Sequence, residues 1–397
     1  MSDKNDNVKK GPGTTVVTSG RKPDEYFGFI NPPVYHGSTI LYPDVATLKS
    51  RKQRYTYARR GNPTAEALED ALSELDGGAG TVLVPSGLAA ISLAFLSVVR
   101  ANGHVLVTDS AYEPTRHFCD TVLKQLGIET TYFDPLIDGA SLKALIRDNT
   151  QAVFLEAPGS QTFEMQDIPA LAAAAKSSGA TVIMDNTWAT PLFFRPLDHG
   201  VDIAVYAGTK YVGGHSDVML GSVTANETLW RKVHNTWGSM GLASGPDDIY
   251  LGQRGLRTMH VRLERHMASA LEIARWLETR PEVSRVLHPG LENHPGHAIW
   301  KRDFSGSSGL FSIIMKPGPD EAVAAFLDDR AYFKLGYSWG GYESLIIPFN
   351  CSKYRTATTF EPEGPAIRLH AGLEDVADLK ADLEAGLERW REAGGGA

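Results

Sequence analysis

The chain has 397 residues, 42% of them hydrophobic and 22% charged, which is the composition of an ordinary soluble globular protein. A single hydrophobic core stops growing at roughly 250–300 residues, so at least two domains are expected. Lysine and arginine number 39 against 47 aspartates and glutamates, and this net charge of −8 argues against a nucleic-acid partner, although it leaves room for a local basic pocket that binds an anion.

Cysteine content and hydropathy indicate the cellular compartment in which the protein is expected to work. Only Cys119 and Cys351 are present, so the chain shows neither a disulfide framework nor a thiolate metal site, and we expect a reducing cytoplasm and no metal. Residues 1–10 are polar and lack the apolar segment of a signal peptide. The longest apolar stretch, 88–99, contains two serines and is too short to span a bilayer, so no membrane association is expected.

Residues 1–62 are expected to form an N-terminal arm. Residues 1–25 are polar, and the rest of the segment is irregular and rich in proline, tyrosine and arginine. The arm carries Tyr57 and Arg59, whose side chains can donate hydrogen bonds to a phosphate or move a proton. A surface loop with solvated arginines is the alternative, and it is favoured unless other motifs also indicate a phosphate.

Residues 63–256 have the pattern of an α/β domain. A helix is expected at 65–75, and strand-like and helix-like runs then alternate. The expected strands are 81–85, 104–108, 129–133, 152–156, 181–185, 203–206 and 218–223. This alternation predicts βαβ units and a mostly parallel sheet, with ligands bound at the carboxyl ends of its strands.

Two loops at this predicted edge suit an anion and an aromatic ring. Residues 82–90 combine a strand, a tight turn with Gly87 and Leu88, and a helix start whose free N–H groups suit a phosphate. Many α/β connections have this form with nothing bound, so the motif alone is weak. Tyr112 follows the strand at 104–108, where its ring can lie on a planar cofactor or simply pack between domains.

Two charged residues end neighbouring strands. Asp185 ends the run 181–185, and Lys210 follows 203–206 in a turn of small residues. Burying either charge is costly unless each has a partner. Pyridoxal phosphate uses both types, a lysine as a Schiff base and an acidic residue on its ring nitrogen. The alternative is a structural lysine and an aspartate that caps a helix. Thr209 adds a hydroxyl for the same phosphate.

Residues 257–397 predict a smaller α+β domain. It begins with a long amphipathic stretch at 256–279. Strands are then expected at 283–287, 310–315, 343–347 and 366–370, with helices at 319–328 and 374–388. A loop rich in glycine and aromatic residues carries Ser338 and Trp339. Arg368 interrupts an apolar strand, and either a substrate carboxylate or an internal acidic residue could pair with it.

In chain order these segments resemble the Cys/Met-metabolism family of pyridoxal-phosphate enzymes, which have the aspartate-aminotransferase-like fold, fold type I. The resemblance runs from about residue 14 to the last helix. It rests on Tyr57-x-Arg59 and on residues 85–90, 111–112, 185–188, 209–211, 254–258 and 368–370. Any one match could be chance, but the ordered set is specific.

The resemblance implies roles for these residues. Lys210 would form the Schiff base, Asp185 would partner the pyridine nitrogen, and Tyr112 would stack on the ring. The phosphate would be held by Gly87, Leu88 and Thr209 of one subunit and by Tyr57 and Arg59 of its neighbour. The substrate's α-carboxylate would be held by Arg368, Ser338 and Trp339. Proton transfer would fall to Lys210, Tyr112 and Tyr57.

Two departures from the family pattern affect the phosphate site. Leu88 stands where many members have methionine, which is harmless if the contact is through the backbone N–H. Ala207 stands where a hydroxyl residue often helps to bind the phosphate, so that contact is either lost or replaced by Thr209. The resemblance also implies a homo-oligomer with shared active sites, a tetramer built as a dimer of dimers.

The loop at 338–345 resembles that of the bacterial cystathionine β-lyase branch, whereas the γ-synthases and γ-lyases generally lack an aromatic residue at the position of Trp339. The implied activity is that of a carbon–sulfur lyase, which splits L-cystathionine into homocysteine, pyruvate and ammonia in methionine biosynthesis. Other cysteine S-conjugates remain possible substrates. The alternatives are a γ-lyase, γ-synthase or sulfhydrylase of the same family, a cofactor-binding regulatory protein, and an α/β protein without cofactor.

Overall fold

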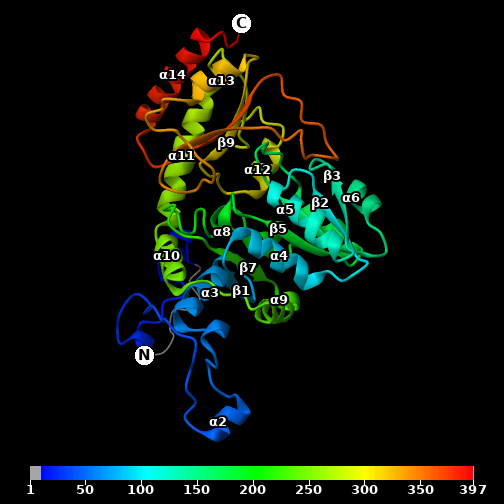
Figure 1. The fold of residues 1–397 in the computed structure, drawn as a ribbon, viewed down its shortest axis with the longest axis vertical. Coiled ribbons are helices and arrows are strands. Elements are labelled where there is room, and N and C mark those ends of the chain that lie inside the picture. Colours follow the sequence, from blue (N-terminus) through cyan, green and yellow to red (C-terminus); the bar gives the residue numbers. More distant parts are fainter. Residues whose placement is uncertain (1–9, 397) are drawn as a thin grey trace.

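The computed structural model describes residues 10–396, so the first nine residues of the expected arm lie outside it. The arm has little regular structure, and its segment with α2 projects away from the body of the molecule (Figure 1). Its short elements are α1 (Pro12–Thr18), η1 (Pro23–Tyr26), α2 (Val45–Ser50) and η2 (Ala58–Arg60). Several of its large apolar side chains are exposed, including Phe27 at 97% and Leu41 at 85%.

The large sheet confirms the predicted α/β pattern. Its strands are β1 (Gly80–Val84), β2 (His104–Thr108), β3 (Glu129–Phe133), β4 (Thr150–Glu156), β5 (Thr181–Asp185), β6 (Ile203–Tyr206) and β7 (Gly221–Ala225), in the spatial order β1-β7-β6-β5-β4-β2-β3. β7 runs antiparallel to both of its neighbours, and the other neighbouring strands are parallel. β7 begins three residues later than the 218–223 expected for it.

Helices cover both faces of this sheet. They are α3 (Pro63–Asp76), α4 (Gly87–Val98), α5 (Glu113–Phe118) with its π-helical continuation η3 (Cys119–Leu123), α6 (Gly139–Leu145), α7 (Ile168–Ser177), α8 (Thr190–Phe193), η4 (Pro196–His199) and α9 (Glu227–Met240). The helix expected at 65–75 is α3, which begins at the Asn62 N-cap. None of the helices in residues 10–396 is long and apolar enough to cross a membrane.

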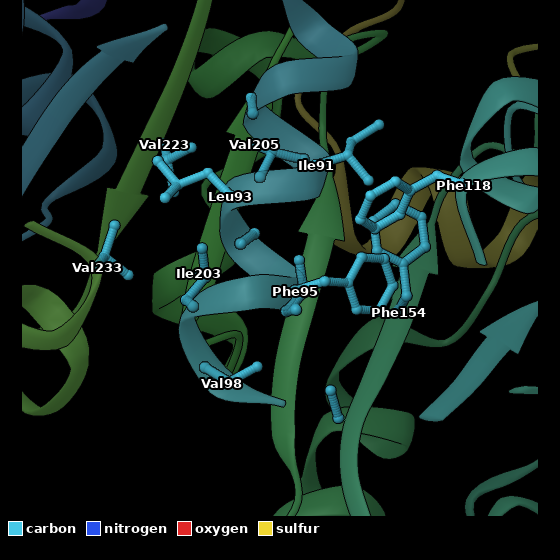
Figure 2. Packing of buried hydrophobic residues seen from close by; sticks show 14 of the residues in the cluster. Ile91, Leu93, Phe95, Val98, Phe118, Phe154, Ile203, Val205, Val223 and Val233 are labelled. Carbon is cyan, nitrogen blue, oxygen red and sulfur yellow. The ribbon is translucent and has the colours of Figure 1, made fainter. Parts of the chain in front are cut away.

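Helix α4 is apolar on nearly all sides because it is buried among other elements. Ile91, Leu93 and Phe95 are at most 1% exposed and pack against side chains of the central strands (Figure 2). The Phe95 and Phe154 rings stack with their centroids 5.4 Å apart. Burial of such side chains stabilises a fold by about 1.5–3 kcal/mol each, so this packing fixes the N-terminus of α4 at the carboxyl edge of the sheet.

The C-terminal part has a second sheet, with its own core. Its strands are β8 (Val283–Leu287), β9 (Leu310–Met315), β10 (Lys334–Leu335), β11 (Leu345–Phe349) and β12 (Ala366–His370), in the order β10-β11-β12-β9-β8. Its helices are α11 (Met259–Leu277), α12 (His297–Asp303), α13 (Asp320–Leu327) and α14 (Val376–Glu392). The preceding helix, α10 (Pro246–Leu256), packs on α3 beside the large sheet. The two-residue β10 was not predicted, because it is too short to show a hydropathy pattern.

Separate cores underlie the two sheets. The C-terminal core gathers Phe311, Phe326 and Trp390, all fully buried, whereas Phe95 and Phe154 belong to the core of the large sheet. The division into an arm (1–62), a cofactor-binding domain (63–256) and a C-terminal domain (257–397) stays a prediction, which these separate cores support.

Candidate active site

A cavity of about 340 Å³ lies at the carboxyl edge of the large sheet and is closed on one side by the C-terminal domain. Nine of the predicted site residues line it: Gly87, Leu88, Tyr112, Asp185, Thr209, Lys210, Ser338, Trp339 and Arg368. The two walls are joined where the Trp188 indole N–H donates to the Leu310 carbonyl of β9 at 2.9 Å. The structure therefore assembles in one place residues that span 282 positions of the sequence, from 87 to 368.

Asp185 and Lys210 come from adjacent strands, as predicted. β5 and β6 are parallel neighbours with Asp185 opposite Val205, and Lys210 follows β6 in the turn beyond Tyr206. Parallel strands bring their carboxyl ends to the same edge, so the carboxylate and the amine enter the same cavity.

Thr187 holds the Asp185 carboxylate in place. Its backbone N–H and its hydroxyl both donate to Asp185 Oδ1, at 2.9 and 2.6 Å, and its hydroxyl oxygen accepts the Ala207 N–H at 2.9 Å. Within the described chain, Asp185 Oδ2 has no hydrogen-bond partner. Burial raises the pKa of Asp185, while the bonds from Thr187 oppose that rise. A buried carboxylate with one free oxygen fits a protonated ring nitrogen.

Lys210 is held against the loop of the C-terminal domain. Its Nζ donates to Ser338 Oγ at 2.5 Å and lies 5.1 Å from the centroid of the Trp339 ring. Burial, helped by the positive charge of Arg368 and opposed by Asp185, lowers the pKa of Lys210 to about 8. A lysine with this pKa is partly neutral near physiological pH, as a nucleophile and a base must be.

The N-terminus of α4 has the free donors that were predicted for an anion site. The Ser86 side chain caps the helix by accepting the Ala89 N–H at 3.2 Å, and the first-turn N–H groups of Gly87 and Leu88 have no partner in a helix. A Cβ on Gly87 would lie 2.6 Å from the Cβ of Ala207, so only glycine lets the helix approach the loop before Lys210 so closely. These donors and this narrow approach fit a phosphate.

Thr209 is already hydrogen-bonded on both sides of its hydroxyl. It donates to the Leu220 carbonyl at 3.1 Å and accepts the Leu220 N–H at 3.0 Å. A phosphate contact through its hydroxyl hydrogen would require the first bond to break, so this contact stays a prediction. Ala207 brings no hydroxyl, which leaves the backbone N–H groups of α4 as the main donors from this subunit.

Tyr112 is the N-cap residue of α5 and stands beside two carboxylates, those of Glu156 and Asp185. Its N–H donates to Glu156 Oε2 at 2.8 Å, and its side chain is 47% exposed. The surrounding pocket raises the pKa of Tyr112 by desolvation, and the charge of Asp185 adds to this effect. Tyr112 therefore keeps its hydroxyl proton at neutral pH, which suits a ring that stacks or donates rather than a general base.

Glu156 was missed in the sequence, although it too ends a strand. In the β4–β5 register it lies opposite Asp185. Burial, with the neighbouring charge of Asp185, raises the pKa of Glu156 well above its ordinary value. An acidic residue at the end of a third strand of the same edge was the available signal. Thr187 was missed as well, because nothing in the sequence indicates its contact with Ala207.

Arg368 offers its guanidinium to the cavity. Its Nη2 donates to the Ser338 carbonyl at 3.0 Å, and among residues 10–396 it pairs with no carboxylate. Burial lowers the pKa of Arg368 to about 10, so it remains charged at neutral pH. The alternative of an internal acidic partner is wrong within the described chain, and the free guanidinium suits a carboxylate ligand.

The arm residues Tyr57 and Arg59 do not reach this cavity. Arg59 Nη1 donates to the Gly238 carbonyl at 3.0 Å, and the side chain of Tyr57 is 47% exposed. Neither residue lines the cavity of its own chain. Their predicted contact with a cofactor phosphate can therefore be made only in another copy of the chain. Residues 10–396 contain no group of three or more His, Cys, Asp or Glu side chains placed to hold a metal ion.

Residues 13–388 match the family model described as Cys/Met metabolism PLP-dependent enzyme. The chain is 54% identical to a putative cystathionine β-lyase of Rhizobium johnstonii, with 98% of each chain covered. It is 43% identical to the cystathionine β-lyase MetC of Escherichia coli, over 95% of this chain and 98% of that protein.

A solved structure with the same fold carries a different name. The cystathionine γ-synthase of Xanthomonas oryzae pv. oryzae, in complex with aminoacrylate and cysteine, superposes with a TM-score of 0.89 at 33% identity, over 97% of this chain and all of that one. The fold is therefore shared between proteins named for different reactions, and the choice of reaction must depend on individual residues of the site.

Proposed function

The chain belongs to the Cys/Met metabolism family of PLP-dependent enzymes, and we propose that it is a carbon–sulfur lyase that splits L-cystathionine with water into L-homocysteine, pyruvate and ammonia. The expected fold type I and the expected cofactor, pyridoxal 5′-phosphate, are both confirmed. The observation that carries the proposal is the contact of Lys210 with Ser338 and Trp339, because it places the proton-moving amine against the loop that resembles the β-lyase branch.

The residues of the large domain are proposed to hold the cofactor. Lys210 attaches it, Asp185 pairs with its ring nitrogen, Tyr112 covers its ring, and the N–H groups of Gly87 and Leu88 face its phosphate. Thr209 is the remaining candidate for the phosphate. When bound, the cofactor supplies an electron sink next to the substrate's α-carbon.

Proton transfer is proposed to fall chiefly to Lys210. Because burial lowers its pKa to about 8, a neutral amine is available to take the α-proton. The bond between Cβ and sulfur then breaks, and the leaving thiolate takes a proton from Lys210 or from a tyrosine. Tyr112 keeps its hydroxyl proton and can serve as that donor. Tyr57 of a neighbouring subunit is the second candidate.

The substrate's α-carboxylate is proposed to bind at Arg368. The guanidinium is free of other carboxylates in the described chain and is oriented by its bond to the Ser338 carbonyl. The Trp339 ring lies over Lys210, with Nζ 5.1 Å from the ring centroid, and it is the residue on which the resemblance to the β-lyase branch rests. Other cysteine S-conjugates fit the same proposal, because elimination depends on the leaving group more than on the rest of the molecule.

Product analysis tests the reaction. Purified holoenzyme given L-cystathionine should release pyruvate and homocysteine in equal amounts. Release of 2-oxobutyrate and cysteine would instead assign γ-elimination, and joining of an activated homoserine to a thiol would assign a synthase. Turnover too slow to measure, with the cofactor bound, would favour a regulatory role. Absence of cofactor absorbance would contradict every one of these functions.

A shared active site is proposed for the oligomer, with a tetramer as its full form, in the cytoplasm and in methionine biosynthesis. The exposed apolar side chains of the arm support it, as does the distance of Tyr57 and Arg59 from their own cavity. Co-expressed Arg59→Ala and Lys210→Ala chains test it, because a hybrid dimer would regain one intact site. Activity restored above that of either variant is expected, and no restoration would contradict the sharing.

A further inference from the structure

The loop that carries Ser338 and Trp339 has an unusual backbone. Ser338 has a φ of 78° and Gly340 a φ of 85°. Both values lie in the left-handed region of the backbone, which residues other than glycine rarely adopt. A Cβ on Gly340 would lie 3.0 Å from the Cα of Lys210, so the loop packs directly on the backbone of that lysine. Tyr337 is 91% exposed and adds no packing, whereas Trp339 packs on Tyr211 with the ring centroids 5.5 Å apart. The backbone beyond Trp339 is held by a hydrogen-bonding side chain.

His370 supplies that contact from β12. Its Nε2 accepts the Gly340 N–H at 3.1 Å, and its Nδ1 lies 3.1 Å from the Glu343 carbonyl. An imidazole nitrogen that accepts a backbone N–H carries no proton, so Nδ1 holds the proton and donates to Glu343. One neutral ring, 1% exposed, thus braces the 338–343 loop at its middle, Gly340, and at its end, Glu343.

The brace reaches the substrate side through Ser338. Arg368 stands two residues before His370 and therefore projects from the same face of β12. Its guanidinium donates to the Ser338 carbonyl, while the Ser338 hydroxyl accepts from Lys210. A loop released from His370 would let the Ser338 carbonyl move and would leave the guanidinium without its orienting acceptor.

We propose that His370 is a positioning residue that fixes the 338–343 loop, and through it the guanidinium of Arg368, so that the site selects ligands that carry an α-carboxylate. This inference rests on the carboxylate role given to Arg368 in the proposed function. It assigns the selectivity to a residue that touches neither substrate nor cofactor.

Carboxylate selectivity of the holoenzyme is the readout. L-Alanine and ethylamine both offer an amine to the cofactor, but only alanine has the carboxylate, and their dissociation constants can be read from the change in cofactor absorbance. The ratio of these constants isolates the carboxylate contact. A variant that merely loses stability lowers the amount of active protein and leaves the ratio unchanged.

Three variants make the comparison. His370→Phe keeps the ring and removes both bonds, and we expect the selectivity ratio to fall about tenfold, the factor that matches the loss of about 1.4 kcal/mol. His370→Gln places an acceptor near the position of Nε2 and should return the ratio to within about threefold of the wild type, since the Gly340 bond is retained. His266→Phe is the matched control. The His266 ring is equally buried, and its centroid lies 5.1 Å from that of His370, but it is hydrogen-bonded to the Ala371 carbonyl, which is outside the loop.

An unchanged ratio in His370→Phe, or an equal fall in His266→Phe, would overturn the inference. Should His370→Phe fail to yield holoenzyme, His370→Asn replaces it, because asparagine keeps the donor near Nδ1 and loses the acceptor at Nε2. A ratio in His370→Asn no lower than in His370→Gln would then count against the brace.

The same measurement separates this inference from the proposed function. Arg368→Leu should abolish the preference for alanine. If it does not, the carboxylate site itself is wrong, and the proposal for His370 falls with it. If Arg368→Leu loses the preference and His370→Phe keeps it, only the role of His370 is wrong. The ratio can be measured whether or not the enzyme cleaves cystathionine, so a failure of the lyase assignment is seen separately.

Discussion

The two walls of the cavity are built by different means. The wall from the large domain consists of strand ends, where β-ladder register and a buried core fix Asp185 and Lys210. The wall from the C-terminal domain is a loop whose conformation depends on side-chain bonds to its backbone, such as those of His370 and Arg368. The groups proposed to hold the cofactor therefore stand at the edge of the large sheet, whereas the groups proposed to bind the substrate stand on this loop and on the adjoining strand β12.

This difference suggests a division of work between the walls. A sheet edge cannot change one position without disturbing its neighbours, but a loop can change while the sheet stays the same. Changes to the large-domain wall should therefore lower turnover, and changes to the C-terminal wall should lower substrate affinity or selectivity. A family that runs several reactions on one fold is expected to vary the second wall.

Loss of the lysine should give the largest effect. Lys210→Ala removes both the attachment of the cofactor and the base, so we expect kcat to fall by about 10⁴-fold. Pyruvate release from L-cystathionine measures the loss, and borohydride should no longer fix the cofactor to the protein. Lys353→Ala, at an exposed lysine outside the cavity, is the control. If Lys210→Ala retained more than a tenth of the wild-type activity, Lys210 would not be the base, and the catalytic role of the large-domain wall would be wrong.

Asp185→Asn should have the next largest effect and lower kcat by about 10²–10³-fold. The neutral amide keeps the bonds from Thr187 but no longer favours a protonated ring nitrogen, so the electron sink weakens while the substrate contacts remain. We expect KM to change much less than kcat in steady-state kinetics. A variant with unchanged turnover would remove Asp185 from the mechanism. Asp198→Asn, at an exposed ion pair with Arg195, serves as the matched control.

Arg368→Leu should show the opposite pattern on the other wall. Loss of a charged partner for the carboxylate is expected to raise KM for cystathionine by about 10²-fold, with a smaller change in kcat. Arg368→Lys keeps the charge without the two-pronged geometry and should lie between the wild type and the leucine variant. A fall confined to kcat would contradict the division between the walls.

The smallest expected effect is on the pH dependence of cofactor uptake. It tests whether a charge on one wall shifts the pKa of a residue on the other. Only the neutral amine attacks the aldehyde, and burial lowers the pKa of Lys210 to about 8, so its neutral fraction grows as the pH rises through that value. From about pH 7 to about pH 9 the rate of uptake by the cofactor-free protein should rise about tenfold, against about a hundredfold for a lysine with an ordinary pKa.

Arg368 provides the check on that profile. Its positive charge is one of the causes that lower the pKa of Lys210, so Arg368→Leu should move the midpoint of the uptake profile to higher pH. Stopped-flow absorbance records the profile. A midpoint that stays in place in this variant would show that the charge of one wall does not act on the other.

Much of the fold could be predicted because local patterns specify it. The β-branched runs at 181–185 and 203–206 are strands in the structure, and the ordered motifs around Gly87, Tyr112 and Lys210 indicated the cofactor before any geometry was known. Thr209 shows the limit of such motifs, because its hydroxyl is already bonded to the backbone of Leu220. The motif indicates a residue type at a place, but not which bonds that residue has already made.

The sequence by itself determined which chemical groups the protein carries and at which strand ends they stand, because strand and helix periods and turn residues act over a few positions. Only the tertiary structure decided that Glu156 lies opposite Asp185, that Thr187 ties that carboxylate to Ala207, and that His370 braces the loop at Gly340. These contacts join residues 20 to 30 positions apart along the chain. They depend on sheet register and domain packing, which no local pattern records.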